Sequence, residues 1–372
     1  MNEAVRIIAF VCAVIVLAVA IFALTACATG GIGYQTETYE ITENIENLSI
    51  KVDTSDVEIR KSEDGVLKVV CNERKKERHT VKADMGTLEV NSVDDRKWYE
   101  KVSLFGYRTM KVTVYLPEEE YAILNVERST GDLDISAGFI FGDTDIRCST
   151  GDTKIIGSSF GALSVRASTG DITLTEASCT SLTTECSTGC ITLSEVSCAG
   201  DAKITASTGD VAVSDLTAAT LESMSETGEF EAERVTLSGG LAITTDTGKV
   251  SISELSAGDS SVKTDTGRVR ISRAELASFT SDTDTGDVEL ESVVASGSYN
   301  IKADTGDIRF DGCDAAEIYV KTSSGSVKGS FLTPKVIFAE TGSGGIDVPK
   351  LTEGGRCEIK TGSGGIKITI GE

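Results

Sequence analysis

The stretch ASTGDITL at residues 167–174 decides the fold, because it returns as CSTGCITL at 186–193 and as ASTGDVAV at 206–213. Each copy places a glycine after Ser-Thr and then alternates apolar with polar residues. A Thr-Gly or Ser-Gly turn of this kind recurs at steps of 19 or 20 residues, without a gap, to the end of the chain. The turn glycines are Gly131, Gly151, Gly170, Gly189, Gly209, Gly228, Gly248, Gly267, Gly286, Gly306, Gly325, Gly344 and Gly364. Such a period predicts a solenoid, in which each repeat buries its apolar side against the next.

The residues around each turn glycine predict two short strands. Apolar residues stand two and four positions after the glycine with polar residues between them, which is the period of a strand with one face inward. A second strand precedes the glycine, with an apolar residue five positions before it and a small residue three before it. Another inward position follows seven residues after the glycine, and it is occupied by Ala177, Val196, Leu216, Val235, Leu255, Val293 and Leu332.

Two strands and two turns fill the whole coil and leave no room for a helix. The sequence therefore predicts an all-β protein, a parallel β-solenoid of two facing sheets over residues 126–372. The crossover rule predicts a right-handed winding. The glycine is explained by the bend, which needs one residue at positive φ, while the neighbouring Ser, Thr and Asp hydrogen-bond local backbone.

The amino terminus predicts a membrane anchor in residues 1–27, followed by a short linker at 28–33. Residues 7–26 are apolar, carry no charge and are long enough to span a bilayer. The run ends in Leu24-Thr25-Ala26-Cys27, which matches a bacterial lipobox and makes Cys27 a candidate for lipidation. A lipoprotein signal peptide cleaved before Cys27 and an uncleaved single-pass anchor both fit this pattern. Either one holds the protein at the cell membrane with the bulk of the chain extracytoplasmic.

Residues 34–125 alternate apolar and polar residues but lack the regular turn, apart from an echo at Thr54-Ser55-Asp56. We expect a β-rich domain that caps the first coil, because an exposed edge strand invites pairing with other chains. No comparable cap follows Ile370, so that end of the solenoid is expected to be open. The one aromatic cluster, Trp98, Tyr99, Phe105 and Tyr107, is either a hairpin packed on the cap or a contact patch for a ligand or membrane.

The net charge of −23 disfavours nucleic acid and anionic lipid as partners. Acidic residues also stand two positions before the turn glycine in five successive coils. They are Glu226, Asp246, Asp265, Asp284 and Asp304. Two interpretations stay open: aspartates at these turns accept backbone hydrogen bonds, or the last two coils bind calcium between them. We expect no cofactor and no dedicated metal site.

Cysteine and histidine offer little further chemistry. Cys179 and Cys198 both lie nine residues after a turn glycine and should stack in adjacent coils, about 5 Å apart, either as a disulfide or as an unpaired ladder. Cys186 and Cys190 flank one turn, which is weak evidence for a metal. The single histidine, His79, sits in the charged run at 74–79 and is expected to be exposed, which argues against Ser-His-Asp catalysis and histidine-rich zinc sites.

The repeated Ser/Thr-Gly-Asp turns, entered through Val114-Tyr115-Leu116-Pro117 and Leu124-Asn125-Val126, resemble the bacterial putative-adhesin domain, a domain of unknown function. The resemblance covers the chain from about residue 40 to its end. It implies an exported or membrane-anchored β-solenoid of Gram-positive bacteria, in some members linked to envelope stress. It supplies no catalytic residues.

These features predict a non-enzymatic surface protein, an adhesin or interaction scaffold that presents a repetitive acidic surface. An envelope polymer or another membrane protein is the expected partner. One alternative is an accessory of an envelope-stress sensor that binds through the cap and the Trp98 region. Another is a carbohydrate-active enzyme that uses paired carboxylates on a β-helix.

Overall fold

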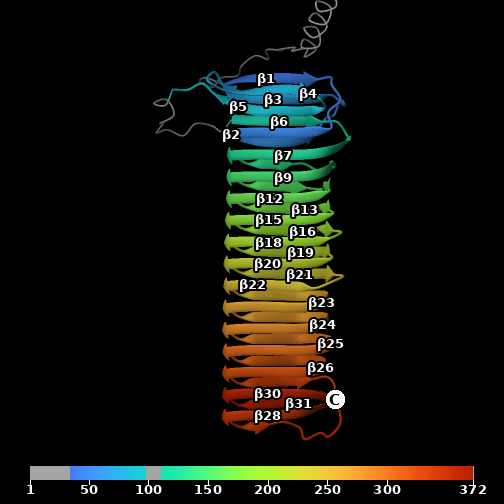
Figure 1. Cartoon of the computed structure of the whole chain (residues 1–372), viewed down its shortest axis with the longest axis vertical. Helices are drawn as coiled ribbons and strands as arrows, with labels where there is room; N and C mark the ends of the chain where they lie inside the picture. The colour runs from blue at the N-terminus through green and yellow to red at the C-terminus, as the bar shows by residue number, and fades with distance from the viewer. Residues whose placement is uncertain (1–33, 98–109, 372) are drawn as a thin grey trace, which may run out of the picture. The chain divides into compact units, whose positions relative to one another are not determined.

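The structure is a computed structural model that describes residues 34–97 and 110–371. The predicted anchor with Cys27, and the patch of Trp98, Tyr99, Phe105 and Tyr107, lie outside these ranges. All regular elements of the described residues are β-strands, which confirms the all-β class and the parallel solenoid (Figure 1). Nowhere in residues 34–97 and 110–371 is there a helix with the length and hydrophobicity needed to cross a membrane.

The chain divides into two compact units, Met1–Ala162 and Leu163–Glu372. The domain boundary expected at residue 125 lies within the first of them.

The first unit begins with strands that pair in both directions. These strands are β1 (Tyr34–Ile41), β2 (Asn47–Lys61), β3 (Leu67–Arg74), β4 (Glu77–Asp84), β5 (Thr87–Asp94) and β6 (Met110–Leu116). Strand β3 is antiparallel to β1, β4 and β6, and β4 is antiparallel to β5. Strand β2 instead runs parallel to β5 and β6.

Strand β2 also connects these strands to the parallel ladder of this unit. It pairs in parallel with β7 (Glu120–Thr130) and β8 (Leu133–Ile135), so that Thr54 lies opposite Thr130. The ladder continues through β9 (Ile140–Thr150), β10 (Thr153–Ile156) and β11 (Ser159–Phe160). The Thr54-Ser55-Asp56 echo is therefore the turn of a coil, although the sequence around it departs from the repeat.

The second unit repeats the predicted register coil by coil. Its first strands are β12 (Ala162–Thr169), β13 (Ile172–Thr175), β14 (Ser178–Cys179), β15 (Ser181–Thr188), β16 (Ile191–Ser194), β17 (Ser197–Cys198), β18 (Asp201–Thr208), β19 (Val211–Ala218), β20 (Thr220–Thr227), β21 (Phe230–Leu237) and β22 (Leu241–Thr247). Ile172 lies opposite Ile191, which lies opposite Val211, exactly one repeat apart, and all three side chains are buried. The predicted inward file two residues after the turn glycine is thus confirmed in these coils.

The next coils do not break into two strands as predicted. Each is a single strand of 17 or 18 residues that bends around the corner: β23 (Val250–Thr266), β24 (Val269–Thr285), β25 (Val288–Thr305) and β26 (Ile308–Ser324). Inter-coil hydrogen bonding continues through the bend, which is why the second turn does not interrupt these strands.

The corner itself uses non-glycine residues in the left-handed conformation. They lie six positions after a turn glycine, have φ between 52° and 55°, and are Glu176, Glu195, Asp215, Arg234, Glu254, Arg273 and Ser292. Glutamate and arginine have no preference for the left-handed region, so the residue types at these positions do not predict a corner.

The last coils are out of sequence order. They consist of β27 (Val327–Phe331), β28 (Lys335–Ser343), β29 (Ile346–Asp347), β30 (Gly355–Ser363) and β31 (Ile366–Ile370). Strand β30 pairs with β26 on one side and with β28 on the other, and β31 likewise lies between β27 and β29 (Figure 1). The final coil is therefore inserted between two earlier ones, and the expectation that every coil stacks on its predecessor is wrong here.

The two coils differ at their inward positions. The inserted coil has Ile359 and Ile366, both fully buried, whereas the coil of β28 and β29 has Ala339 and Ile346, of which Ile346 is 48% exposed. Burying Ile359 removes more apolar surface from water than burying Ala339 would, whereas the preceding inward position pairs Cys357 of the inserted coil with Ile337 of β28. The open edge predicted after Ile370 is consequently formed by β28 and β29. Leu332, predicted to point inward, is also exposed, and its neighbour Phe331 is buried instead.

Candidate functional site

The residue after the turn glycine links neighbouring coils. Asp210 Oδ1 accepts a hydrogen bond from the backbone N–H of Glu229 at 2.8 Å, one coil further on. Asp171, Asp287 and Asp307 accept equivalent bonds at 2.8 to 2.9 Å. The bond from the Ser326 N–H lowers the pKa of Asp307. The aspartates directly after the turn glycine therefore accept backbone hydrogen bonds from the next coil, whereas for the acidic residues two positions before the glycine this role stays a prediction.

The turn glycines are required because successive turns nearly touch. A Cβ on Gly209 would lie 2.1 Å from the carbonyl oxygen of Gly189, and the φ of Gly209 is +136°. Both the space and the backbone angle exclude a side chain. A Cβ would also lie 1.8 to 2.4 Å from a carbonyl oxygen of the neighbouring coil at eleven further turn glycines, so these glycines have a structural role.

The acidic file before the turn is exposed throughout: Glu226, Asp246, Asp265, Asp284 and Asp304. Among the described residues, a single group of three potential metal-ligating side chains approaches within 4.8 Å, and it lies in the other unit. The acidic file thus lacks the convergence of oxygen ligands that calcium favours.

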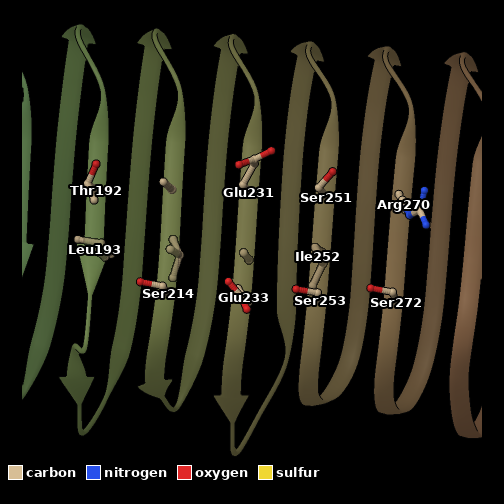
Figure 2. A pocket seen from close by; sticks show the side chains of 13 residues that line it. Thr192, Leu193, Ser214, Glu231, Glu233, Ser251, Ile252, Ser253, Arg270 and Ser272 are labelled. Atoms are coloured by element: carbon tan, nitrogen blue, oxygen red, sulfur yellow. The ribbon is translucent and has the colours of Figure 1, made fainter.

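A shallow groove runs over the outward face of β16, β19, β21, β23 and β24 (Figure 2). Its side chains form two files in register. One file is Thr192, Ala212, Glu231, Ser251 and Arg270, and the other is Ser214, Glu233, Ser253 and Ser272, with Ser194 next in register beyond the groove. Neighbours in a file are about 4.8 Å apart, the spacing of hydrogen-bonded strands. We call this surface the serine face.

Ion pairs compensate many charges around the serine face. Arg270 contacts Glu289 at 3.8 Å and Glu291 at 3.0 Å, and Glu231 contacts Lys249 at 3.6 Å. At the corner, Arg234 forms a bidentate pair with Asp215 at 2.7 and 3.0 Å. Hydroxyl groups lie on β16, β19, β23 and β24 of the face, and β21 between them carries Glu231 and Glu233. The lining residues present hydroxyls, the carboxylates of Glu231 and Glu233 and the guanidinium of Arg270.

Cys179 and Cys198 lie directly opposite each other in β14 and β17, as predicted, and both are buried free thiols. Burial raises the pKa of Cys179, and Cys198 adds to the shift. The mass of the unreduced protein distinguishes this ladder from a disulfide. Of the second pair, Cys186 is buried and Cys190 is exposed, so the two do not share an environment.

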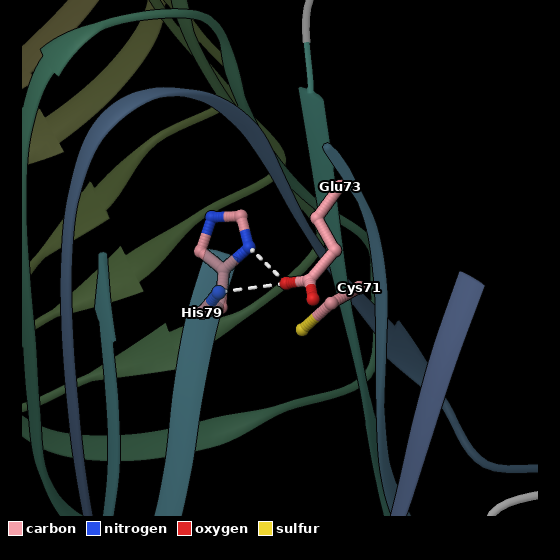
Figure 3. A group of neighbouring side chains, drawn as sticks. All are labelled: Cys71, Glu73 and His79. Carbon is pink, nitrogen blue, oxygen red and sulfur yellow. Dashed lines mark hydrogen bonds and ion pairs between the residues drawn. The ribbon is translucent and has the colours of Figure 1, made fainter. Parts of the chain in front are cut away.

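The expectation that His79 is exposed is wrong. His79 is 3% exposed, and its ring lies beside Glu73 (Figure 3) and also contacts Ser55. His79 Nε2 is 3.0 Å from Ser55 Oγ, and Nδ1 is 3.1 Å from Glu73 Oε2. The same carboxylate oxygen accepts the backbone N–H of His79 at 2.7 Å. Charged neighbours such as Arg78 point outward from the same strand, because side chains of a strand alternate between its faces.

This order of hydroxyl, imidazole and carboxylate is that of a serine hydrolase triad. A nucleophile must reach a substrate carbonyl, but Ser55 has no exposed surface, and Gly131 packs on its backbone so closely that a Cβ there would lie 2.4 Å from the Ser55 carbonyl oxygen. The three side chains therefore have the hydrogen bonds of a catalytic triad, but a substrate cannot reach Ser55. We assign the cluster no hydrolytic role.

Cys71 completes this buried cluster. It lies two residues before Glu73 on the same face of β3 and has no exposed surface. Burial raises the pKa of its thiol, with the Glu73 and Glu37 carboxylates adding to the shift. Burial, with the same cysteine and Glu73 nearby, raises the pKa of Tyr39 to about 12. One sequence signal could have indicated this cluster: the spacing Cys71-x-Glu73, followed by His79 on the next strand.

Two solved structures resemble parts of this chain. One is described as a putative adhesin from Bacteroides fragilis, with 14% identity, a TM-score of 0.34, and coverage of 73% of this chain and 98% of that one. The other is described as a putative cell adhesion protein from Clostridium sporogenes, with 12% identity, a TM-score of 0.19, and coverage of 91% and 100%. No curated protein matches the chain significantly.

A protein-family model gives the assignment. It matches residues 45–253, 181–299 and 257–372, which together span nearly all of the described solenoid and leave out the amino terminus. The overlapping matches are expected of a chain built from one repeated coil. The chain belongs to the Toastrack DUF4097 family.

Proposed function

We propose that this protein is a non-enzymatic component of the bacterial cell envelope, an adhesin or interaction scaffold that binds through the serine face. One observation carries the proposal: hydroxyl side chains recur in register on four of five consecutive strands, at the spacing of the strands, while β21 between them carries Glu231 and Glu233. Each hydroxyl alone binds weakly. A file of them can bind an extended partner many times at once, which raises the overall affinity without any strong single contact.

The apolar run at 7–26 and the lipobox ending in Cys27 support a place outside the cytoplasmic membrane, with the chain tethered to it. In this proposal the anchor fixes the protein at the membrane, and the serine face meets material of the envelope.

The chemistry of the face favours an extended polymer rich in hydroxyl and amide groups, such as the glycan strands of peptidoglycan. The net charge of −23 works against polyanions, including nucleic acid and anionic lipid surfaces. A neutral polymer avoids this repulsion and can pair with successive serine and threonine side chains.

Co-sedimentation with purified peptidoglycan, stripped of anionic polymers, tests the proposal. The test variant combines Ser214→Glu, Ser253→Glu and Ser272→Glu. The matched control combines Ser261→Glu, Thr280→Glu and Asn300→Glu, three exposed residues in register on the other strand segment of neighbouring coils.

Both variants add three negative charges, so a general effect of charge acts on them equally. We expect the serine-face variant to lose binding at least tenfold and the control to bind as the wild type does. Equal binding by all three proteins would refute the serine face as the contact surface.

A further inference from the structure

We propose that Cys71, Glu73 and His79 form a binding site for Zn²⁺ within the first unit, independent of the serine face. Their ligand atoms, the Sγ, a carboxylate oxygen and a ring nitrogen, all lie within 4.8 Å of one another. Figure 3 shows the Glu73 carboxylate between the imidazole and the thiol. It is the one such group among residues 34–97 and 110–371.

The types of the three ligand atoms indicate which metal ion fits the site. Thiolate, imidazole and carboxylate together suit Zn²⁺, whereas Ca²⁺ and Mg²⁺ prefer oxygen ligands alone. A tetrahedral Zn²⁺ holds such atoms about 3.2 to 3.7 Å apart, as follows from bond lengths near 2.0 Å to nitrogen and oxygen and 2.3 Å to sulfur. The Glu73 and His79 atoms are already 3.1 Å apart. Side-chain rotations that bring the sulfur inward by about 1 Å complete the geometry.

Local structure fixes the ligands. Cys71 and Glu73 are two residues apart in β3 and therefore project from the same face. His79 stands in β4, which is joined to β3 by the tight turn at Lys75-Lys76, with Arg74 opposite Glu77. The ligands thus belong to one hairpin, and binding needs no rearrangement of the backbone.

Ser55 supplies the contact that a metal-binding histidine requires. When the Nε2–H of His79 donates to Ser55 Oγ, at 3.0 Å, the lone pair of Nδ1 points toward Glu73 and Cys71. Outer hydrogen bonds of this kind fix the tautomer and the ring plane of histidine ligands. Because Ser55 belongs to β2, a metal here would tie the hairpin to the strand that connects with the parallel ladder.

Burial favours a cation in the cluster, beyond the two contacts that the Glu73 carboxylate already makes with His79. Glu73 is 2% exposed and His79 is 3% exposed, while Cys71 has no exposed surface. A buried carboxylate is costly unless it is paired with positive charge. One divalent cation neutralises the carboxylate and the thiolate together and takes the imidazole as a neutral ligand. The fourth position is left to water.

Co²⁺ substitution tests the site directly, because a cobalt–thiolate bond gives a charge-transfer band and a tetrahedral ion gives intense visible bands. The full chain is stripped of metal and loaded in two ways, by titration of the folded protein and by refolding with Co²⁺ present. We expect one Co²⁺ per chain with both spectral features, displaced by one equivalent of Zn²⁺ and unaffected by excess Mg²⁺ or Ca²⁺. Absence of the thiolate band under both loading conditions would overturn the proposal.

Variants assign the ligands. Cys71→Ser should abolish the thiolate band, whereas Cys357→Ser, which alters an equally buried thiol elsewhere, should leave it intact. Ser55→Ala leaves all three ligands in place and should weaken Zn²⁺ binding by about 10- to 100-fold. If Cys71→Ser fails to fold, the Ser55→Ala and wild-type spectra still decide the question. A Cys71→Ser protein that folds and keeps the band would place the metal elsewhere and contradict the assignment.

Discussion

Lys335 Nζ lies 2.5 Å from Asp314 Oδ1, and the strand β30 passes between the strands that carry them. Gly355 of β30 stands opposite Lys335, and a Cβ at this glycine would lie 3.2 Å from the lysine nitrogen. The missing side chain opens the path by which Lys335 reaches over the inserted coil. Thr333 Oγ1 accepts a further hydrogen bond from the same nitrogen at 2.7 Å. The contact clamps the inserted coil between its neighbours.

Lys335→Met should loosen these last coils. The lysine side chain is 3% exposed and the Asp314 side chain 14% exposed, so removal of the cation leaves a largely buried carboxylate unpaired. The loss should cost about 3 kcal/mol, the lower end for a broken buried pair. Hydrogen exchange in β28 and β30 should accelerate by roughly 100-fold, since 1.4 kcal/mol is a factor of ten. Lys350→Met, at an exposed site nearby, is the control, and equal exchange rates in the two variants would show that the clamp is without effect.

Gly209→Ala should destabilise the second unit. The new Cβ would lie 2.1 Å from the Gly189 carbonyl oxygen, at a φ of +136° that side chains avoid. Relief requires the two turns to separate, and backbone strain of this type costs about 1 to 3 kcal/mol. Gly345→Ala is the comparison, because a Cβ at Gly345 meets nothing within 4 Å. Thermal melts of the two variants would be indistinguishable if the turns were not packed as described.

Asp307→Asn should alter how stability depends on pH. The Ser326 N–H holds the pKa of Asp307 below the usual 3.8 in the folded chain. The ionised group therefore stabilises the fold above about pH 4, and this contribution is lost as the pH falls through the folded pKa. The asparagine keeps the acceptor oxygen but does not titrate. The melting temperature of the wild type should fall more steeply than that of the variant between pH 5 and pH 2, whereas parallel curves would remove Asp307 from the acid response.

Glu195→Gly should stabilise the corner, against the usual effect of glycine. Glu195 has a φ of 55°, and a left-handed residue with a side chain costs about 1 to 2 kcal/mol, which exceeds the entropy cost of glycine of about 0.5 to 1 kcal/mol. The net gain should be about 0.5 kcal/mol. Thr192→Gly, three residues earlier within β16, should destabilise because its backbone is extended. Denaturant melts measure both, and a loss of stability in Glu195→Gly would contradict the observed corner geometry.

The repeat predicts the fold well because the same residues indicate the strands, the coils and the register between coils. The alternation around Gly209 predicts strands, its period predicts coils, and the equal spacing sets the register of Val211 against Phe230, which the structure confirms. What the repeat cannot specify is the order of coils that share one register. Ile359 and Ala339 occupy equivalent positions in coils of the same register, so the repeat itself does not say which of the two coils lies inside.

The buried cluster was missed for a different reason. His79 follows Lys75, Lys76 and Arg78, and that run of charge suggests an exposed turn. Strand alternation separates these residues in space, with Arg78 outward and His79 inward. Ser55 and His79 come together only through the pairing of strands distant in sequence, which no local pattern encodes.

A graded series on the serine face tests the central claim most directly. Ser253→Glu alone, then with Ser272→Glu, then with Ser214→Glu as well, removes one, two and three hydroxyl contacts from the same file, in which Glu233 separates Ser214 from Ser253. If stacked coils bind an extended polymer through repeated weak contacts, peptidoglycan affinity should fall stepwise by a similar factor with each substitution. An affinity that stays at the wild-type value through the triple variant, or that collapses fully at the first substitution, would contradict multivalent binding along this face.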